Sequence, residues 1–491
     1  MATQQREKQD LRFVIIGAGM AGILSAIKLR EAGYRDITIY EKADRIGGTW
    51  RENTYPGLTC DVPSHSYTYT FEPNPDWSHR YPPGDEIQAY FEGVVEKYGV
   101  GELIRFDEEI TRAEFVDGRW RLERKSGEKD EADFVIAATG VLHHPSHPDI
   151  EGLDDFEGAL FHTARWDHDV PLDGRRVGII GNGSTGVQIV SALASRAGAL
   201  HQFQRTAQWI MPSENPEYSE QEKAEYREHP ELLEQIRSDF TSNEGVGRFT
   251  YAITHPDSPE MAEIEAAVLE NLEQSVKDPE LRERLRPTYR AACKRLIFSP
   301  DYYDAIQHPN AELVTDPIER VEAGGVRLTN GRLVELDVLA LATGFRADRF
   351  MRPMELIGRN GATLEAVWEK SPQAYLAISI PDFPNFFMLN GPNGPVGNFS
   401  LIDIAERQME YIEQLIALVR DGRCREVSTS PEAMRRFEAE RIEAARNTVW
   451  ASGCNSWYLD ADGVPASWPF SWQRFIDEMS GPKLDDYELV A

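Results

Sequence analysis

The sequence has few cysteines, a shortage of positive charge and no long hydrophobic run. Its four cysteines form no CxxC pair and show no metal-ligand spacing. We therefore expect no metal site and buried free thiols, as in a reducing compartment, at Cys60, Cys293, Cys424 and Cys454. No apolar segment is long enough to cross a bilayer, and the polar N-terminus lacks the features of an export signal. These absences predict a cytoplasmic protein without an integral membrane segment.

Acidic residues greatly outnumber basic ones. The 491 residues include 52 lysines and arginines against 82 aspartates and glutamates, a formal net charge of −30. Such a charge repels nucleic acid and anionic membrane surfaces. We therefore expect small-molecule partners and no nucleic acid. The length is sufficient for several domains, while the oligomeric state is left open.

A glycine-rich loop follows the first apolar segment of the chain, residues 13–16. A helical pattern then runs to Leu29, and a second strand-like segment ends at Glu41. In such a βαβ unit the glycines allow a tight turn and a close approach of the backbone to a pyrophosphate, which lies at the helix N-terminus. We interpret the unit as an FAD site in which Glu41 bonds the ribose hydroxyls and the loop consists of Gly17, Ala18, Gly19, Met20, Ala21 and Gly22.

The same pattern recurs after a second apolar segment, residues 176–180. A helical pattern runs to Leu193 and is followed by a strand-like segment that ends at Arg205. The recurrence predicts a second dinucleotide site. Its residues would be Gly181, Asn182, Gly183, Ser184, Thr185, Gly186 and, in the helix, Gln188.

One position distinguishes the two sites. Arg205 has the same offset from the last glycine of its loop as Glu41 has from Gly22. A carboxylate there accepts from a free ribose hydroxyl, whereas a guanidinium pairs with a 2′-phosphate. With Thr206 as a second phosphate donor, the site is predicted to bind NADPH rather than NADH. The alternative interpretation of Arg205 is a solvated cation at a strand end.

Two longer motifs narrow the chemistry. Residues 47–61 read GGTWRENTYPGLTCD and residues 156–167 read FEGALFHTARWD. Both resemble signatures of the Baeyer-Villiger monooxygenases, flavin-dependent class B enzymes that use FAD and NADPH. The first matches at seven specified positions and the second at Phe156, Gly158, His162 and Trp166, with Asp167 where proline is more usual. The resemblance covers about residues 10 to 475.

The resemblance implies roles for individual residues. Gly48, Thr49, Trp50, Asp61 and Tyr67 would line the flavin, and the backbone near Ile110 would touch its adenine end. Ordinary core packing is the alternative for Trp50 and Tyr67.

A Lys-Arg pair supplies the remaining polar groups that the resemblance implies. Lys294 would contact the 2′-phosphate, Arg295 would approach the flavin and pair with Asp61, and Trp457 would cover the nicotinamide. Asp61 and Arg295 are the predicted catalytic residues.

The resemblance also implies the reaction. NADPH would reduce the flavin, O₂ would add at its C4a carbon, and the resulting peroxide would attack a ketone to give an ester or lactone. An arginine keeps its proton at working pH and donates several fixed hydrogen bonds, so it stabilises developing oxygen anions. N- or S-oxygenation is the first alternative. A flavin reductase or redox sensor without oxygen insertion is another.

Histidines suggest two further sites that we interpret as structural. His162 lies in the second motif, between domains, where a hinge role is favoured over a general base. The segment HHPSHP, residues 143–148, invites a metal interpretation, but its prolines suit an extended linker.

The predicted fold class is α/β, with two Rossmann-like dinucleotide-binding domains and a helical insertion. Two segments ending in ATG, at Gly140 and Gly344, indicate chain crossovers between the domains. The expected divisions are an FAD-binding part at 1–145, an NADP-binding domain at 146–340 with the insertion at about 215–290, and a second FAD-binding part with the C-terminal segment at 341–491.

Overall fold

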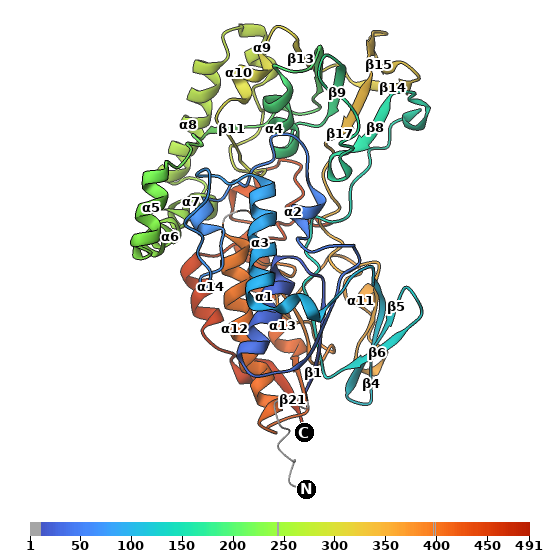
Figure 1. Cartoon of the computed structure of the whole chain (residues 1–491), viewed down its shortest axis with the longest axis vertical. Coiled ribbons are helices and arrows are strands. Elements are labelled where there is room, and N and C mark those ends of the chain that lie inside the picture. The colour runs from blue at the N-terminus through green and yellow to red at the C-terminus, as the bar shows by residue number, and fades with distance from the viewer. Residues whose placement is uncertain (1–10, 243–244, 396, 398) are drawn as a thin grey trace.

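The computed structural model describes residues 11–242, 245–395, 397 and 399–491, and its parallel sheets lie in two lobes (Figure 1). The lower lobe in Figure 1 contains a five-stranded parallel sheet. Its order is β19 (Phe386–Met388), β7 (Phe134–Ala137), β1 (Arg12–Ile16), β2 (Asp36–Tyr40) and β3 (Ile104–Arg105).

The upper lobe contains a second five-stranded parallel sheet, with the order β13 (Ala311–Val314), β10 (Ala199–Phe203), β9 (Arg176–Ile180), β17 (Val338–Leu341) and β8 (Ala159–His162). The central strands β1 and β9 are buried at every position after the first. Strands covered on both faces read as continuous apolar runs, which is the pattern of residues 13–16 and 177–180. The predicted α/β class is confirmed.

Smaller sheets flank these two. One has the order β18 (Glu355–Ile357), β4 (Ile110–Val116), β5 (Arg119–Arg124) and β6 (Lys129–Ala132). Another is formed by β14 (Ile318–Glu322), β15 (Gly325–Leu328) and β16 (Leu333–Glu335). The two-stranded pairs are β11 (Ile210–Pro212) with β12 (Ile297–Ser299), and β20 (Glu426–Thr429) with β21 (Tyr487–Val490).

The lower lobe combines the beginning and the end of the chain. Strand β19 pairs in parallel with β7, and the late helices stand beside α1 in Figure 1. Apolar side chains of α1, α3 and α12 share one core cluster. The helices of this lobe are α1 (Met20–Glu31), α2 (Thr49–Glu52), α3 (Gly84–Tyr98), α11 (Leu364–Val367), α12 (Leu401–Arg420), α13 (Pro431–Ala445) and α14 (Trp472–Met479).

Helices of the upper half lie between β9 and β13 in sequence. Helix α4 (Ser184–Leu193) follows the second glycine loop, and α10 (Tyr302–Ile306) packs beside it. The segment predicted as a helical insertion contains α5 (Glu220–Glu228), α6 (Glu231–Thr241), α7 (Val246–Thr254), α8 (Pro259–Ser275) and α9 (Pro279–Arg284). No helix in the described part of the chain is both long enough and apolar enough to span a membrane.

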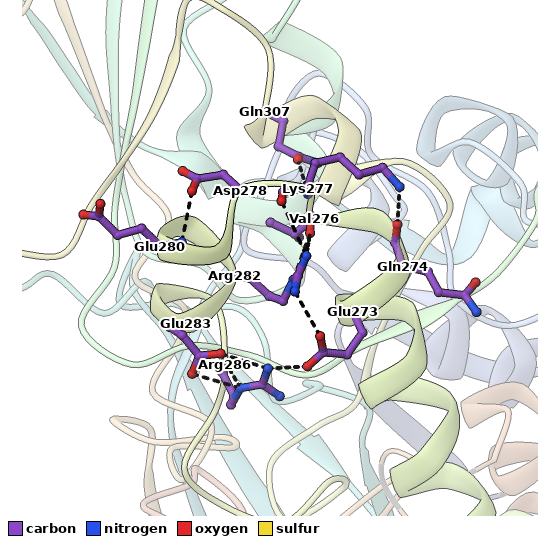
Figure 2. Close-up of polar contacts among 10 residues, drawn as sticks. All are labelled: Glu273, Gln274, Val276, Lys277, Asp278, Glu280, Arg282, Glu283, Arg286 and Gln307. Atoms are coloured by element: carbon purple, nitrogen blue, oxygen red, sulfur yellow. Dashed lines mark hydrogen bonds and ion pairs between the residues drawn. The ribbon is translucent and has the colours of Figure 1, made fainter.

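The turn between α8 and α9 is fixed by charged side chains (Figure 2). Arg282 and Arg286 both pair with Glu273, and Arg282 Nε donates to the Val276 carbonyl at 2.9 Å. The Lys277 amide donates to Gln307 Oε1 at 2.8 Å, which ties the turn to the residue following α10. Gln204 Nε2 donates to the Arg284 carbonyl of α9 at 2.8 Å, so this helix lies close to the end of β10, next to Arg205.

Two cysteines form a disulfide, which corrects the expectation of four free thiols. Cys293 and Cys454 are bonded across a sequence separation of 161 residues, whereas Cys60 and Cys424 are buried and free. The expectation was wrong for the bonded pair because the fold brings together two segments that no local spacing relates. One segment contains Arg295 and the other contains Trp457.

The disulfide predicts a thiol count. The chain denatured without reductant should react with a thiol reagent at Cys60 and Cys424 alone, and at all four cysteines after reduction. Mass spectrometry of a non-reduced digest should recover the peptides of Cys293 and Cys454 joined. Four reactive thiols before reduction would show that the bond does not form.

A buried ionic group joins the insertion to α12. Arg237 of α6 donates to Asp403 Oδ1 at 2.5 Å and to the Thr68 carbonyl at 2.7 Å, and it lies 3.7 Å from Glu406. Glu406 Oε1 also accepts from the Thr70 amide at 2.9 Å. Burial raises the pKa of Glu406 from its ordinary value of 4.5 to about 7. A single guanidinium thus serves two buried carboxyl groups.

This group predicts a pH dependence of stability. Since the pKa of Glu406 is higher in the folded state, the folded chain binds more protons between pH 4.5 and about 7, and its stability falls as the pH rises through that interval. Glu406→Gln removes this titration, so it should flatten the decline in unfolding free energy, by about 3 kcal/mol at most. The measurement is urea unfolding across the interval.

The control is Glu410→Gln, which alters an exposed carboxylate on the same helix. It should leave the pH slope as in the parent protein. An equal slope in Glu406→Gln and the parent protein would show that Glu406 is not the titrating group.

Candidate functional site

Both glycine loops lie where the central strand of a parallel sheet leads into a helix, and a backbone carbonyl lies close to each loop. A Cβ placed on Gly17 would lie 2.6 Å from the Ala138 carbonyl oxygen, and one on Gly181 would lie 2.3 Å from that of Ala342. Ala138 and Ala342 belong to the two ATG segments. Each crossover therefore packs directly against a loop, and only glycine fits at these two positions.

Glu41 lies beside the first loop, immediately after β2. Its Oε2 accepts from the Ala18 amide at 2.7 Å, and its Oε1 accepts from the Ala43 amide at 3.0 Å and from Arg51 at 3.2 Å. The carboxylate is 5% exposed. Arg51 was not predicted from the sequence, since its pairing with Glu41 depends on how α2 folds back on the loop.

The first long motif packs on the same loop. A Cβ on Gly48 would lie 3.2 Å from the Gly19 Cα, so the two backbones approach closely at the N-terminus of α1. Thr49 begins α2. Trp50 Nε1 donates to the buried Tyr67 hydroxyl at 3.1 Å, with the rings edge to face.

One more predicted residue, Ile110, and one residue that was not predicted, Ser66, belong to this region. Ile110 begins β4 and is buried in the same cluster as Tyr40, the last residue of β2. The hydroxyl of Ser66, next to Tyr67, is buried without a protein partner. Ser66 was not predicted as a site residue, and its free hydroxyl is available to a bound group.

The second loop is tied to the strand that bears Arg205. Asn182 Nδ2 donates to Gln204 Oε1 and to the Thr206 carbonyl, both at 2.8 Å. A Cβ on Gly183, the residue before α4, would have no neighbour within 4 Å. Gln204 Nε2 also donates to the Arg284 carbonyl of α9 at 2.8 Å. The loop therefore presents an open face next to Arg205 and Thr206.

Two cations adjoin this face. Burial and the charge of Arg205 together lower the pKa of Lys294. The Lys294 ammonium lies 4.6 Å from the centroid of the Tyr289 ring. Within the described ranges, no ion pair involves either Arg205 or Lys294. Two adjacent cations without a carboxylate form a receptor for an anion such as a phosphate.

The first motif also docks onto α4. A Cβ on Gly57 would lie 2.7 Å from the Gln188 carbonyl oxygen. The Tyr55 hydroxyl donates to Gln188 Oε1 at 2.8 Å, and Gln188 Nε2 donates to the Thr59 carbonyl at 3.0 Å. Thr185 Oγ1 lies 3.4 Å from the Tyr55 hydroxyl. Gln188 and Thr185 thus contact the motif from the other lobe.

Asp61 and Arg295 meet at this junction, as the sequence predicts. Arg295 Nη2 donates to Asp61 Oδ2 at 2.5 Å, and about 30% of each side chain is exposed, 31% and 27%. The charge of Asp61 raises the pKa of Arg295 above its usual range. The guanidinium is a permanent cation, held by one carboxylate and still open on one side.

Trp457 and Tyr458 lie close to Arg295 in the folded chain. The Tyr458 hydroxyl lies near the Arg295 guanidinium and interacts with its charge, a contact that the sequence did not suggest. Trp457 is 49% exposed, and its ring centroid lies 4.3 Å from that of Tyr458. Trp457 is therefore not a core residue.

His162 occupies the crossover between the lobes. Its Nε2 donates to the Gly344 carbonyl at 3.1 Å, and its Nδ1 accepts from the Ala164 amide at 3.1 Å. Burial lowers the pKa of His162 to about 4. With both ring nitrogens bonded to backbone, His162 holds the crossover and does not present a base.

The predicted linker at residues 143–148 lies against the second crossover. His143 Nε2 donates to the Phe350 carbonyl at 2.8 Å, and the Ser146 amide donates to that of Gly344. In the described residues, no three His, Cys, Asp or Glu side chains converge as metal ligands would.

Known proteins share this arrangement. A family model described as pyridine nucleotide-disulphide oxidoreductase matches residues 14–243. The chain is 46% identical over 475 residues to an uncharacterised monooxygenase of Mycobacterium tuberculosis, covering 97% of this chain and 95% of that protein. It is 36% identical over 498 residues to a Baeyer-Villiger monooxygenase of Streptomyces coelicolor, covering 100% and 95%.

Solved structures agree over the full length. The structure of cyclohexanone monooxygenase from Rhodococcus sp. Phi1 bound to NADP⁺ superposes with a TM-score of 0.87 at 30% identity, covering 98% of this chain and 99% of that one. A steroid monooxygenase bound to NADP superposes with a TM-score of 0.87 at 28% identity and the same coverage. Matches of this identity over nearly the whole of both sequences establish that the chain belongs to the Baeyer-Villiger monooxygenase family of flavin-dependent oxygenases.

Proposed function

We propose that this enzyme inserts one oxygen atom of O₂ beside the carbonyl of a ketone, using FAD and NADPH, with Asp61 and Arg295 as its catalytic pair. The observation that carries the proposal is the position of Arg295. A permanent cation from the upper lobe is held at 2.5 Å by Asp61, the last residue of the lower-lobe motif at residues 47–61, and it is partly exposed. A fixed guanidinium at the junction of two dinucleotide-binding units suits the stabilisation of an oxygen anion.

The residues of the two loops fit their nucleotides. For FAD, Glu41 lies at the strand end that would meet the ribose, and Gly17 and Gly19 leave the backbone just before α1 without side chains at these two positions, where a pyrophosphate would bind. Thr49, Trp50, Tyr67 and the backbone near Ile110 would complete that site. For NADPH, the open face at Gly183 adjoins Thr206, which can donate a hydrogen bond, and Arg205 and Lys294, whose positive charges match a 2′-phosphate. Bound together, NADPH and FAD supply the electrons that activate O₂.

The protein contributes charge, orientation and shielding. Arg295 stabilises negative charge on oxygen as the carbonyl carbon becomes tetrahedral. Asp61 orients Arg295 and offsets the free energy of partly burying its charge. Trp457, half exposed beside Tyr458, would cover the nicotinamide side of the site. Exclusion of water by such a cover favours oxygen transfer over release of hydrogen peroxide.

We propose the domain division that the sequence suggests. Residues 1–145 and 341–491 would form the FAD-binding domain, supported by the pairing of β19 with β7, and residues 146–340 the NADP-binding domain. For the class of ketone, the proposal follows the related structures. One related structure is a cyclohexanone monooxygenase bound to ε-caprolactone, so cyclic ketones are the first substrates to test.

The reaction is tested by turnover with isotopically labelled O₂ and a panel of ketones and sulfides. A labelled ester or lactone, formed with NADPH consumption, is the expected product. Labelled sulfoxide without any ester would favour heteroatom oxygenation. Hydrogen peroxide alone across the panel would contradict the proposal.

Arg295→Ala should separate reduction from oxygenation. Flavin reduction by NADPH should persist, because the loops are intact, while ester formation should fall by about 100-fold or more, as when a preorganised donor to an oxyanion is removed. Arg295→Lys should also be impaired, since an ammonium cannot reproduce the fixed fork of donors. Stopped-flow absorbance of the flavin and product analysis measure the two steps.

The matched control is Arg290→Ala on the same segment, which removes a guanidinium paired with Glu265. It should leave ester formation close to that of the parent protein. Undiminished ester formation in Arg295→Ala would remove Arg295 from the mechanism.

Arg205→Ala should change the choice of nucleotide. Loss of a charge-assisted contact to the 2′-phosphate should raise the KM for NADPH by about 10- to 100-fold and leave that for NADH unchanged. Steady-state kinetics with both nucleotides measure this. Arg196→Ala, which removes a surface arginine paired with Asp173 in the same domain, should alter neither value. Parallel changes for NADPH and NADH would contradict the assigned role.

A further inference from the structure

Tyr458 is a buried residue in the segment after α13 whose hydroxyl is directed at Arg295. It is 4% exposed, and its hydroxyl oxygen lies near the Arg295 guanidinium, with whose charge it interacts. Asp61 accepts from Nη2 of the same guanidinium. Arg295 therefore has two partners, one charged and one neutral, that come from opposite ends of the sequence.

Gly397 shows how closely these groups converge. A Cβ built there would lie 2.2 Å from the Tyr458 hydroxyl oxygen and 3.4 Å from Arg295 Nη1. The hydroxyl and the guanidinium thus occupy one small volume, from which the backbone at 397 excludes any side chain. Arg295, Gly397 and Tyr458, which are distant from one another in the sequence, all border this volume.

The ring of Tyr458 is fixed independently of Arg295. Its centroid lies 5.3 Å from that of Trp450, in a cluster that includes Ala252 and Met261 of the insertion. The Tyr458 carbonyl accepts from the Ala466 amide at 2.7 Å. The disulfide joins Cys454 to Cys293, two residues before Arg295. Segment 454–458 and the arginine are consequently held together by a covalent bond as well as by packing.

A neutral partner has a distinct effect on Arg295. The pair of Arg295 and Asp61 is formally neutral, so a second carboxylate would make the group negative, whereas a phenol hydroxyl can restrain the guanidinium without adding charge. Burial raises the pKa of Tyr458, so the phenol is neutral at working pH. With Asp61 and Tyr458 both beside it, the Arg295 guanidinium has less freedom to rotate than it would have with Asp61 alone.

We infer that Tyr458 is a positioning residue, which orients the Arg295 guanidinium toward the reacting oxygen while Asp61 balances its charge. The inference rests on the proposed role of Arg295. It assigns to Tyr458 an effect on the partition between ester and hydrogen peroxide, and no effect on the binding of NADPH.

The test is Tyr458→Phe, which removes the hydroxyl and keeps the ring. Flavin reduction and the KM for NADPH should be unchanged, while the ratio of ester to hydrogen peroxide should fall about tenfold, the effect of one lost polar contact with a charged group. Tyr411→Phe is the matched control, since it removes a buried hydroxyl bonded to Tyr487 instead. A ratio equal to that of the control would overturn the inference.

A second measurement does not depend on turnover. Urea unfolding of Tyr458→Phe, Arg295→Met and the double variant forms a cycle that reports the contact itself. Tyr458→Phe should lower stability in the parent protein and have a much smaller effect where Arg295 is already replaced. Equal effects in both backgrounds would overturn the inference. If the parent protein forms no ester from any ketone, the proposed function fails, and the cycle still decides whether the two side chains interact.

Discussion

The ion pair between Asp61 and Arg295 is the constraint on which the site depends. It spans the two lobes, so it exists only if the lobes meet in one relative position. The motif at residues 47–61 stabilises that position because its Tyr55 and Gly57 pack on α4 of the other lobe. The segment of Arg295 is restrained in turn by the disulfide to Cys454. Packing between the lobes and the disulfide therefore both help to hold Asp61 and Arg295 in contact.

A partly buried charge needs both a partner and an opening. Removing a guanidinium from water costs free energy unless a carboxylate and further hydrogen bonds compensate. Asp61 and Tyr458 supply that compensation, while about a third of the Arg295 side chain remains exposed. Full burial would leave the cation without access to a substrate, and full exposure would screen its charge. The observed exposure lies between these limits.

The crossovers combine mechanical and binding roles. The alanine carbonyl of each ATG segment lies close to a glycine loop. At the crossover between the lobes, both ring nitrogens of His162 form hydrogen bonds with the backbone. The chain passes between lobes where the nucleotide loops lie. A rotation of one lobe would therefore displace loops, crossovers and the ion pair together.

Local sequence was sufficient to predict the strands, the glycine loops and the difference between an acidic residue at Glu41 and a basic one at Arg205. Each of these features depends on residues within one βαβ unit. The runs at 13–16 and 177–180 are apolar since they are covered on both faces, and Gly17 and Gly181, which follow them, are required because carbonyls lie close by. Family resemblance added Asp61 and Arg295, and the structure brings them together.

What the sequence could not determine depends on contacts between distant segments. The disulfide joins residues 161 positions apart, and the expectation of free thiols failed because no local pattern relates Cys293 to Cys454. The contacts of Arg51 with Glu41 and of Tyr458 with Arg295 have the same origin. The sequence by itself determined which cofactor chemistry the loops suit, since backbone geometry and charge at a strand end are local properties. Only the tertiary structure decided how Arg295 is held, because its partners Asp61 and Tyr458 are both distant from it in the sequence.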